Sequence, residues 1–202
     1  MNKLTEKLLV IGLSELDQQF SLFSFMFDNH EVNLKKEEEI SIKAGDIVSE
    51  IYNELIKQYI DPNNVDSQKS LNQLCVRLVF CLYAEDASIF GKKNLFYDYL
   101  AHIQVSYWRQ ALIDLFRVLD TKESDRDPYL AEELKPFPYV NGRMFSDENI
   151  EIPNFNDELK DLILVKASED FDWSEFSPTI FGAAFESTLN PETHSSGGMH
   201  YT

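Results

Sequence analysis

Residues 71–83 read LNQLCVRLVFCLY, and this stretch decides the fold. Its apolar residues recur every three or four positions, which is the repeat of one helix face. The apolar face is wide, as in a helix that other helices surround. The sequence therefore predicts a helix at the centre of a helical bundle. The apolar positions are Leu71, Leu74, Cys75, Leu78, Val79, Leu82 and Tyr83.

Similar spacing predicts helices on both sides of this central stretch. Ser14 is a candidate N-cap for the first of them. The polar residues 29–39 carry no helical repeat, so we expect a loop there. Asp61-Pro62 breaks the helix that precedes the central one, and residues 91–94 form a turn after it. The other expected helices are 14–28, 40–55, 96–102, 108–119 and 157–167.

The character of the chain changes at residue 120. Residues 120–175 contain 16 acidic and 6 basic residues, a net charge of −10, and four prolines interrupt them. Asn141-Gly142 is a typical two-residue hairpin turn. We therefore expect a mainly α fold, an irregular helical bundle. It would carry a small hairpin near 139–145 or an irregular proline-containing region near 136–155.

Composition excludes several classes of protein. The 202 residues suffice for one domain, or one domain and part of a neighbour, and 44% of them are hydrophobic. The formal charge of −17 argues against a free-standing nucleic-acid-binding domain. No apolar run approaches the roughly 20 residues of a membrane span. Cys75 and Cys81 project to different sides of the central helix, so we expect reduced, buried thiols and a cytoplasmic protein.

Catalytic signals are weak. Residues 133–135 and 158–160 both read Glu-Leu-Lys, which matches part of a Mg²⁺-dependent nuclease signature. The first lies beside a proline and the second on a helical repeat, so both are expected to be surface residues. The histidines show no metal-binding spacing, and no phosphate-binding loop occurs. The motifs alone indicate no complete catalytic constellation.

Glu85 and Asp86 end the predicted central helix with negative charge, which opposes the helix dipole. Two interpretations stay open for them. They could form an ion pair with Lys92 or Arg77, or they could make a functional contact. The structural role is the favoured one.

Four short segments of the sequence are more specific than a helical repeat alone would require. They are RLVFCLYAED at 77–86, FPYVNGRMF at 137–145, DWSEFSPTIFG at 172–182 and GMHYT at 198–202. In this order they resemble the MmeI-like family of adenine-specific DNA methyltransferases, which are single-chain restriction–modification enzymes. In that family the phrases belong to a helicase-like spacer, a helical connector between an N-terminal nuclease and the methyltransferase. The resemblance covers roughly residues 13–202.

The resemblance also implies a cofactor site in an intact parent enzyme. Gly198, His200, Tyr201 and Thr202 match the element that opens the family's methyltransferases and lies against S-adenosylmethionine. The later glycine loop and the Pro-Pro-aromatic tetrapeptide for the flipped adenine do not occur here. We therefore expect the 202 residues to be inactive alone. His194 stands where an arginine is expected, which puts in doubt any phosphate or cofactor contact there.

The implied organisation is a connector domain, 1–176, followed at 177–202 by a lead-in helix and the first residues of a truncated methyltransferase domain. The connector would position nuclease and methyltransferase modules on DNA through contacts within one polypeptide, in a cytoplasmic enzyme of bacterial defence. Asn141-Gly142 and Trp173 are expected to fix its geometry. The alternative is an independent acidic protein–protein interaction domain, which the acid-rich residues 120–175 favour.

Overall fold

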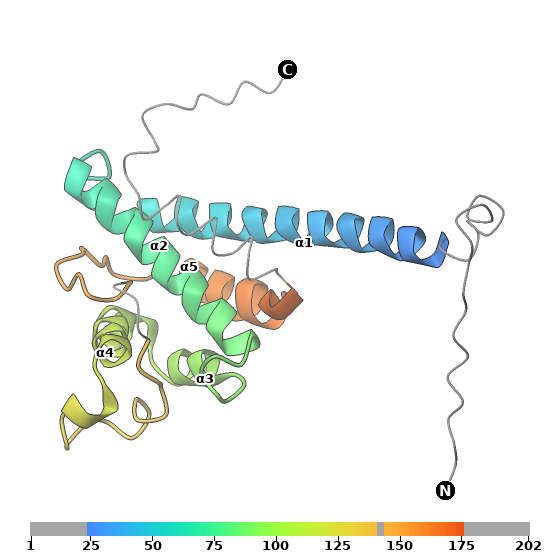
Figure 1. Cartoon of the computed structure of the whole chain (residues 1–202). Helices are drawn as coiled ribbons and strands as arrows, with labels where there is room; N and C mark the ends of the chain where they lie inside the picture. The colour runs from blue at the N-terminus through green and yellow to red at the C-terminus, as the bar shows by residue number, and fades with distance from the viewer. Residues whose placement is uncertain (1–23, 141–143, 176–202) are drawn as a thin grey trace, which may run out of the picture. The chain divides into compact units, whose positions relative to one another are not determined.

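The structure is a computed structural model that describes residues 24–140 and 144–175 (Figure 1). The chain divides into two units, residues 1–39 and 40–202, and all packing discussed below lies within the second. The described residues contain helices and no strand, so the expected mainly α fold is confirmed. No helix among them is both long enough and apolar enough to cross a membrane.

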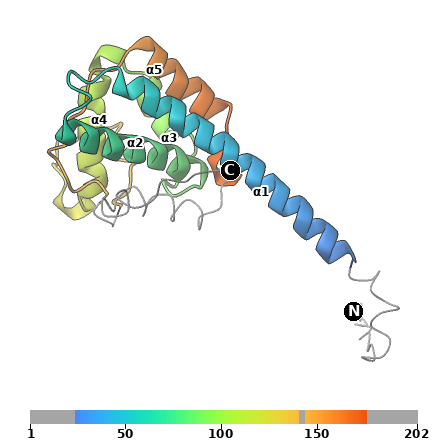
Figure 2. The ribbon, with the colours of Figure 1, turned by 90° about the horizontal axis from the view of Figure 1, so that it is seen from above.

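The central helix is α2 (Val65–Asp86). It begins at Asn64, whose side chain accepts a hydrogen bond of 2.8 Å from the backbone N–H of Asp66 and so caps the helix. Leu74 and Leu78 are completely buried. Figures 1 and 2 show α2 with α1 on one side and α3 and α4 on another. The prediction of a central helix from residues 71–83 is therefore confirmed.

Helix α1 (Ser24–Ile56) is longer than expected. The loop predicted at residues 29–39 is wrong, because these residues continue the helix without a break. Residues 35–39 are all exposed Lys and Glu. Such residues favour a helix by their intrinsic propensity but leave no apolar stripe in the sequence. From Ile40 onward α1 packs into the second unit, as its apolar repeat predicts.

Two helices, α3 and α4, follow the turn at the C-terminal end of α2. Gly91 has a φ of +74°, which suits glycine in the turn between α2 and α3 (Leu95–Ala101). The single 3₁₀ turn η3 (Val105–Tyr107) leads into α4 (Trp108–Asp120). One face of α4 is buried and carries Trp108, Leu112 and Leu115. Both helices lie where the sequence predicts them.

After α4 the chain forms a 3₁₀ turn, η4 (Glu123–Asp125), and then an irregular region. The hairpin expected near 139–145 is not formed by its described residues, and the turn Asn141-Gly142 lies outside the described residues. The N–H of Val140 donates to Leu119 in the last turn of α4, at 2.8 Å, instead of to a partner strand. The irregular alternative near 136–155 is therefore confirmed.

The last described helix starts at Asn156, whose side chain caps α5 (Asp157–Asp161). It continues as a π-helix, η5 (Leu162–Glu169), and a 3₁₀ turn, η6 (Trp173–Glu175), follows. Figure 2 shows α5 and η5 alongside the C-terminal half of α1. Lys166 and Glu50 join them with an ion pair of 2.6 Å. The helix predicted at 157–167 is thus confirmed, and from Leu162 onward its turns are wider than those of an α-helix.

Candidate functional site

The residues expected to contact S-adenosylmethionine, Gly198, His200, Tyr201 and Thr202, lie outside the described residues. The same holds for the lead-in helix expected after residue 177. Within the second unit, the structure instead shows how the helices and the irregular region are held together. Three features carry this information: an arginine clamp on an irregular strap, a neighbouring pair of carboxylates of which one is buried and one half-buried, and an open pocket beside α4.

The strap is residues 144–155, and Arg77 of α2 clamps its first part. Only 2% of Arg77 is exposed. Its Nε donates to the carbonyl of Met144 at 2.9 Å, and its Nη2 donates to the carbonyl of Asp147 at 2.8 Å. The guanidinium also lies 5.2 Å from the ring centre of Phe116 and 5.5 Å from that of Phe145. Burial lowers the pKa of Arg77, but a guanidinium stays charged in proteins.

The second part of the strap is bound to three other places. The hydroxyl of Tyr59 donates to the carbonyl of Glu151 at 2.7 Å, and the N–H of Glu151 donates to the hydroxyl of Ser70 at 3.0 Å. Arg109 of α4 donates to the carbonyl of Ile152 at 2.7 Å. The strap therefore ties α2 to α4 and to the loop after α1, and side chains from these elements take the place of a partner strand for several of its backbone groups.

Glu85 holds the start of α3. Its Oε2 accepts the backbone N–H groups of Phe96 at 2.6 Å and Tyr97 at 2.9 Å, and its Oε1 accepts the Ser168 hydroxyl at 3.3 Å. Burial raises the pKa of Glu85, and these hydrogen bonds oppose the rise. Neither ion pair that the sequence suggested for Glu85 forms. The role is structural, as favoured, but the partners are backbone N–H groups instead of cations.

Asp86 holds the segment after η5. Its Oδ2 accepts the backbone N–H of Trp173 at 2.8 Å. The Trp173 indole is 1% exposed, and its Nε1 donates to the carbonyl of Ala167 at 2.7 Å. The ring of Phe171 packs edge-on against it at 4.9 Å. Trp173 is therefore a core anchor of the described residues.

The carboxylate of Glu85 leads to a testable pH dependence. Because its pKa in the folded protein lies above the ordinary value of 4.5, the folded state binds this proton more tightly than the unfolded state. Glu85 thus favours folding below pH 4.5, and this contribution is lost as the pH rises through the raised pKa. A Glu85→Gln variant keeps an acceptor oxygen without the charge. We expect its stability relative to the wild type to rise across that pH window.

The measurement is urea unfolding from pH 4 to pH 8, followed by circular dichroism. Glu85→Ala, which leaves two N–H groups of α3 without their acceptor, should cost about 1–3 kcal/mol. Glu158→Gln on the exposed face of α5 is the matched control and should follow the wild type throughout. A Glu85→Gln variant that loses stability relative to the wild type as the pH rises would contradict the raised pKa of Glu85.

The glutamates of the two Glu-Leu-Lys matches lie at the surface, as expected. Leu134 and Leu159 are buried in the core, whereas Glu133 and Glu158 are exposed. Within residues 24–140 and 144–175, no group of three His, Cys, Asp or Glu side chains could hold a metal ion. Cys75 and Cys81 are both buried and free, as expected, and burial raises the pKa of Cys75 to about 12.

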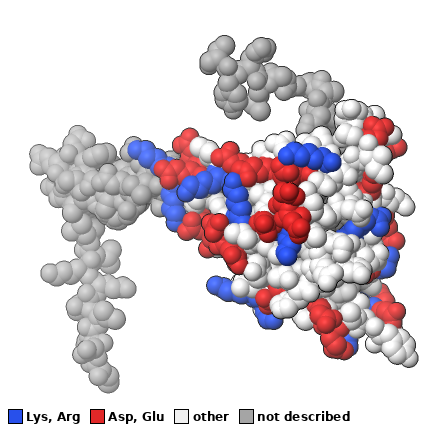
Figure 3. Space-filling view, turned by 180° about the vertical axis from the view of Figure 1, so that it is seen from behind, with Lys and Arg blue, Asp and Glu red and all other residues white. Residues whose placement is uncertain are grey.

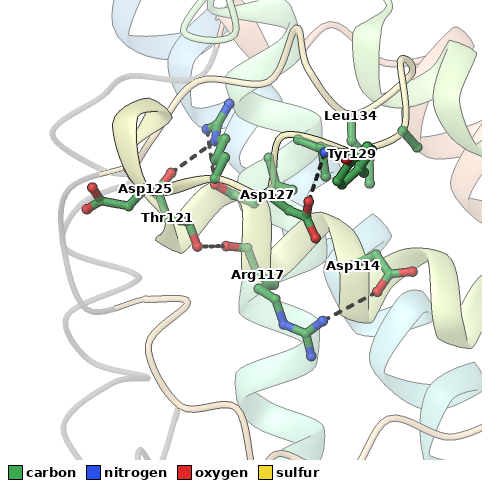
Figure 4. Close-up of a pocket in the computed structure, with 11 residues that line it drawn as sticks. Asp114, Arg117, Thr121, Asp125, Asp127, Tyr129 and Leu134 are labelled. Carbon is green, nitrogen blue, oxygen red and sulfur yellow. Dashed lines mark hydrogen bonds and ion pairs between the residues drawn. The ribbon is translucent and has the colours of Figure 1, made fainter.

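A pocket of about 380 Å³ opens beside the C-terminal half of α4 (Figure 4). It is bounded by α4, by η4 and by the loop that follows η4. The sequence gives little signal for this pocket, because its walls come from an irregular loop. We call it the α4 pocket. Its lining includes Asp114, Arg117, Val118, Asp127, Tyr129 and Leu134.

Comparison with known proteins identifies the region. Residues 69–145 match the family model of the MmeI helicase spacer domain. These residues are similar to the MmeI helicase spacer domain. The matched stretch runs from α2 to the first residues of the strap, so it contains both Arg77 and its partner Met144. The resemblance stated from the four sequence phrases is confirmed.

Two relatives extend the likeness beyond the spacer itself. "DNA methyltransferase A" from Bacillus subtilis (strain 168) is 33% identical over 201 residues, which are 98% of this chain and 22% of that protein. The solved structure of the Type IIL restriction–modification enzyme MmeI in complex with DNA is 34% identical, with a TM-score of 0.60 over 80% of this chain and 21% of that chain. The chain thus spans about a fifth of the length of these relatives.

Proposed function

We propose that this chain is the non-catalytic helical connector of a DNA (adenine-N6) methyltransferase of the restriction–modification type. The observation that carries the proposal is the match of residues 69–145 to the MmeI spacer. The buried Arg77 clamp supports it, because it ties the matched helix α2 to the matched loop. A connector must hold a fixed shape to set the distance and orientation of the modules on either side. The strap and the hydrogen-bonded carboxylates of Glu85 and Asp86 would supply that rigidity.

The chemistry of the parent enzyme is part of the same proposal. The similarity to a DNA methyltransferase and to MmeI supports an S-adenosylmethionine-dependent enzyme of bacterial defence. Gly198, His200, Tyr201 and Thr202 would then approach the cofactor in the intact parent, where the cofactor supplies the methyl group. A glycine permits close approach of the backbone to a ligand, and an aromatic ring can pack beside it. The connector itself would carry out no chemical step.

DNA would be bound mainly by other parts of the parent. The chain has a formal charge of −17, and phosphate contacts require Lys and Arg. Figure 3 shows acidic and basic side chains interspersed on one face of the described residues, without a continuous basic surface there. This distribution suits a scaffold that contacts neighbouring modules. The structure of MmeI with DNA supports DNA as the partner of the intact enzyme.

Methyl transfer tests the proposal. The 202-residue chain should transfer no methyl group from labelled S-adenosylmethionine to DNA, and the intact parent should do so. In the parent, Arg77→Ala should lower methylation through loss of the strap clamp. Lys57→Ala, which removes an exposed cation away from the α4 pocket, is the control and should leave methylation unchanged. Methyl transfer by the isolated chain would overturn the connector role.

The alternative is an independent acidic protein–protein interaction domain. Its support is the net charge of −10 in residues 120–175, which a basic partner could match. The reading frame after residue 202 separates the two proposals. Continuation into a glycine loop and a Pro-Pro-aromatic tetrapeptide supports the connector. A stop codon at that point supports the independent domain.

A further inference from the structure

The α4 pocket has an apolar floor and an exposed aromatic rim. Val118 and Leu134 are 4% and 5% exposed and form part of its lining. At the rim, Tyr129 is 93% exposed, although it is a large aromatic residue that proteins usually cover in part. Figure 4 shows Tyr129 beside Leu134, with Asp127 and Asp114 around the same opening. The pocket therefore offers a surface for an aliphatic stem and a ring face for a planar or charged group.

The charges around the pocket favour a cation. Asp114, Asp125 and Asp127 contribute carboxylates to the lining. Of the two arginines in the lining, Arg126 is 9% exposed in its side chain and donates to the main-chain carbonyls of Val118 and Thr121 at the end of α4, both at 3.1 Å. Its positive charge is therefore already used to cap α4.

Arg117 does not neutralise the remaining acids. Its Nη1 lies 3.8 Å from Oδ1 of Asp114, and its side chain is 59% exposed. A pair of this length at the surface contributes little to stability. Asp127 accepts the backbone N–H of Tyr129 with one oxygen, at 2.8 Å, which fixes the direction of its carboxylate. Oδ1 of Asp114 also accepts a hydrogen bond from Nε2 of Gln110 at 3.0 Å. The rim thus keeps one carboxylate oxygen of Asp114 and one of Asp127 for a donor from outside.

We propose that the α4 pocket is a docking site for an arginine side chain presented by a protein partner. The aliphatic stem would cover the floor at Val118 and Leu134 while the charged head stays at the rim. The guanidinium would donate to the carboxylates of Asp114 and Asp127. It would also stack on the ring of Tyr129, which a planar guanidinium does better than the compact ammonium of lysine. The proposal does not depend on the connector role.

The direct test is NMR of the ¹⁵N-labelled 202-residue chain with small probes. N-acetyl-arginine-amide should shift the amide signals of residues 114–134 at millimolar concentration. The neutral isostere N-acetyl-citrulline-amide should leave them in place, and N-acetyl-lysine-amide should bind more weakly. Equal shifts with citrulline, or no shift with arginine, would overturn the proposal. Inorganic phosphate that shifts these signals more than arginine does would show an anion site at Arg117 and would overturn it as well.

Two variants locate the binding. Tyr129→Ala removes the stacking ring and should weaken arginine binding by about two- to fivefold. Asp114→Asn removes a carboxylate of the rim and should also weaken it. Asp161→Asn, an exposed aspartate on α5 away from the pocket lining, is the matched control and should bind as the wild type does. Dispersed amide spectra confirm that each variant is folded, and equal affinity in all four proteins would overturn the assignment.

Discussion

Replacing Arg77 with alanine should lower the free energy of unfolding by about 3–5 kcal/mol, because the two carbonyls of the strap lose charged donors in a buried site. The rings of Phe116 and Phe145 also lose the guanidinium that packs against them. Urea unfolding followed by circular dichroism at 222 nm measures this difference. Arg77→Lys keeps the charge but cannot reach both carbonyls in a fork, so its loss should be intermediate.

Arg117→Ala is the matched control for this experiment. It removes the same side chain from the exposed face of α4, where its ion pair with Asp114 is 3.8 Å long. Surface pairs of this kind contribute at most about 1 kcal/mol, so the control should remain close to the wild type. If Arg77→Ala and Arg117→Ala proved equally mild, Arg77 would not be the clamp of the strap.

Trp173→Ala should cost about 3–5 kcal/mol, since it empties the space of a large side chain that is only 1% exposed. Trp173→Phe retains an aromatic ring beside Phe171 but leaves the carbonyl of Ala167 without its donor, so we expect a smaller loss, about 1–3 kcal/mol. Circular dichroism is again the suitable signal, because these variants remove a fluorescent side chain.

Tyr129→Ala is the control for Trp173. It also deletes a large aromatic residue, but Tyr129 is 93% exposed, so little apolar surface returns to water. Its unfolding free energy should lie within about 0.5 kcal/mol of the wild type. A Trp173→Ala variant as stable as Tyr129→Ala would show that Trp173 does not anchor the segment after η5 to the core.

Most helices of this chain could be predicted from local spacing. The repeat in residues 71–83 and the amphipathic pattern of α4 both appear in the structure as buried faces. The loop expected at 29–39 was wrong because helix periodicity detects a buried stripe, and an exposed run of Lys and Glu has none. Asn141-Gly142 favoured a hairpin, yet the backbone beside it pairs with α4 and Arg77.

Part of the clamp was visible in the sequence as an anomaly. Arg77 is a charged residue inside the apolar run of α2, and a buried arginine needs acceptors. Its partners are 67 and 70 residues away along the chain, in a stretch without periodicity. No local pattern relates the two. The same holds for Asp86 and Trp173, which are 87 residues apart.

The sequence by itself therefore determined most of the helices, the central place of α2 and the likeness to the MmeI spacer, because each rests on local repeats or on short phrases. The tertiary structure alone decided which groups satisfy Arg77, Glu85 and Asp86, and that the loop after η4 closes a pocket against α4. The physical reason is that buried polar groups must find partners wherever the packed chain supplies them. Which partners are available depends on contacts between segments that are distant in the sequence.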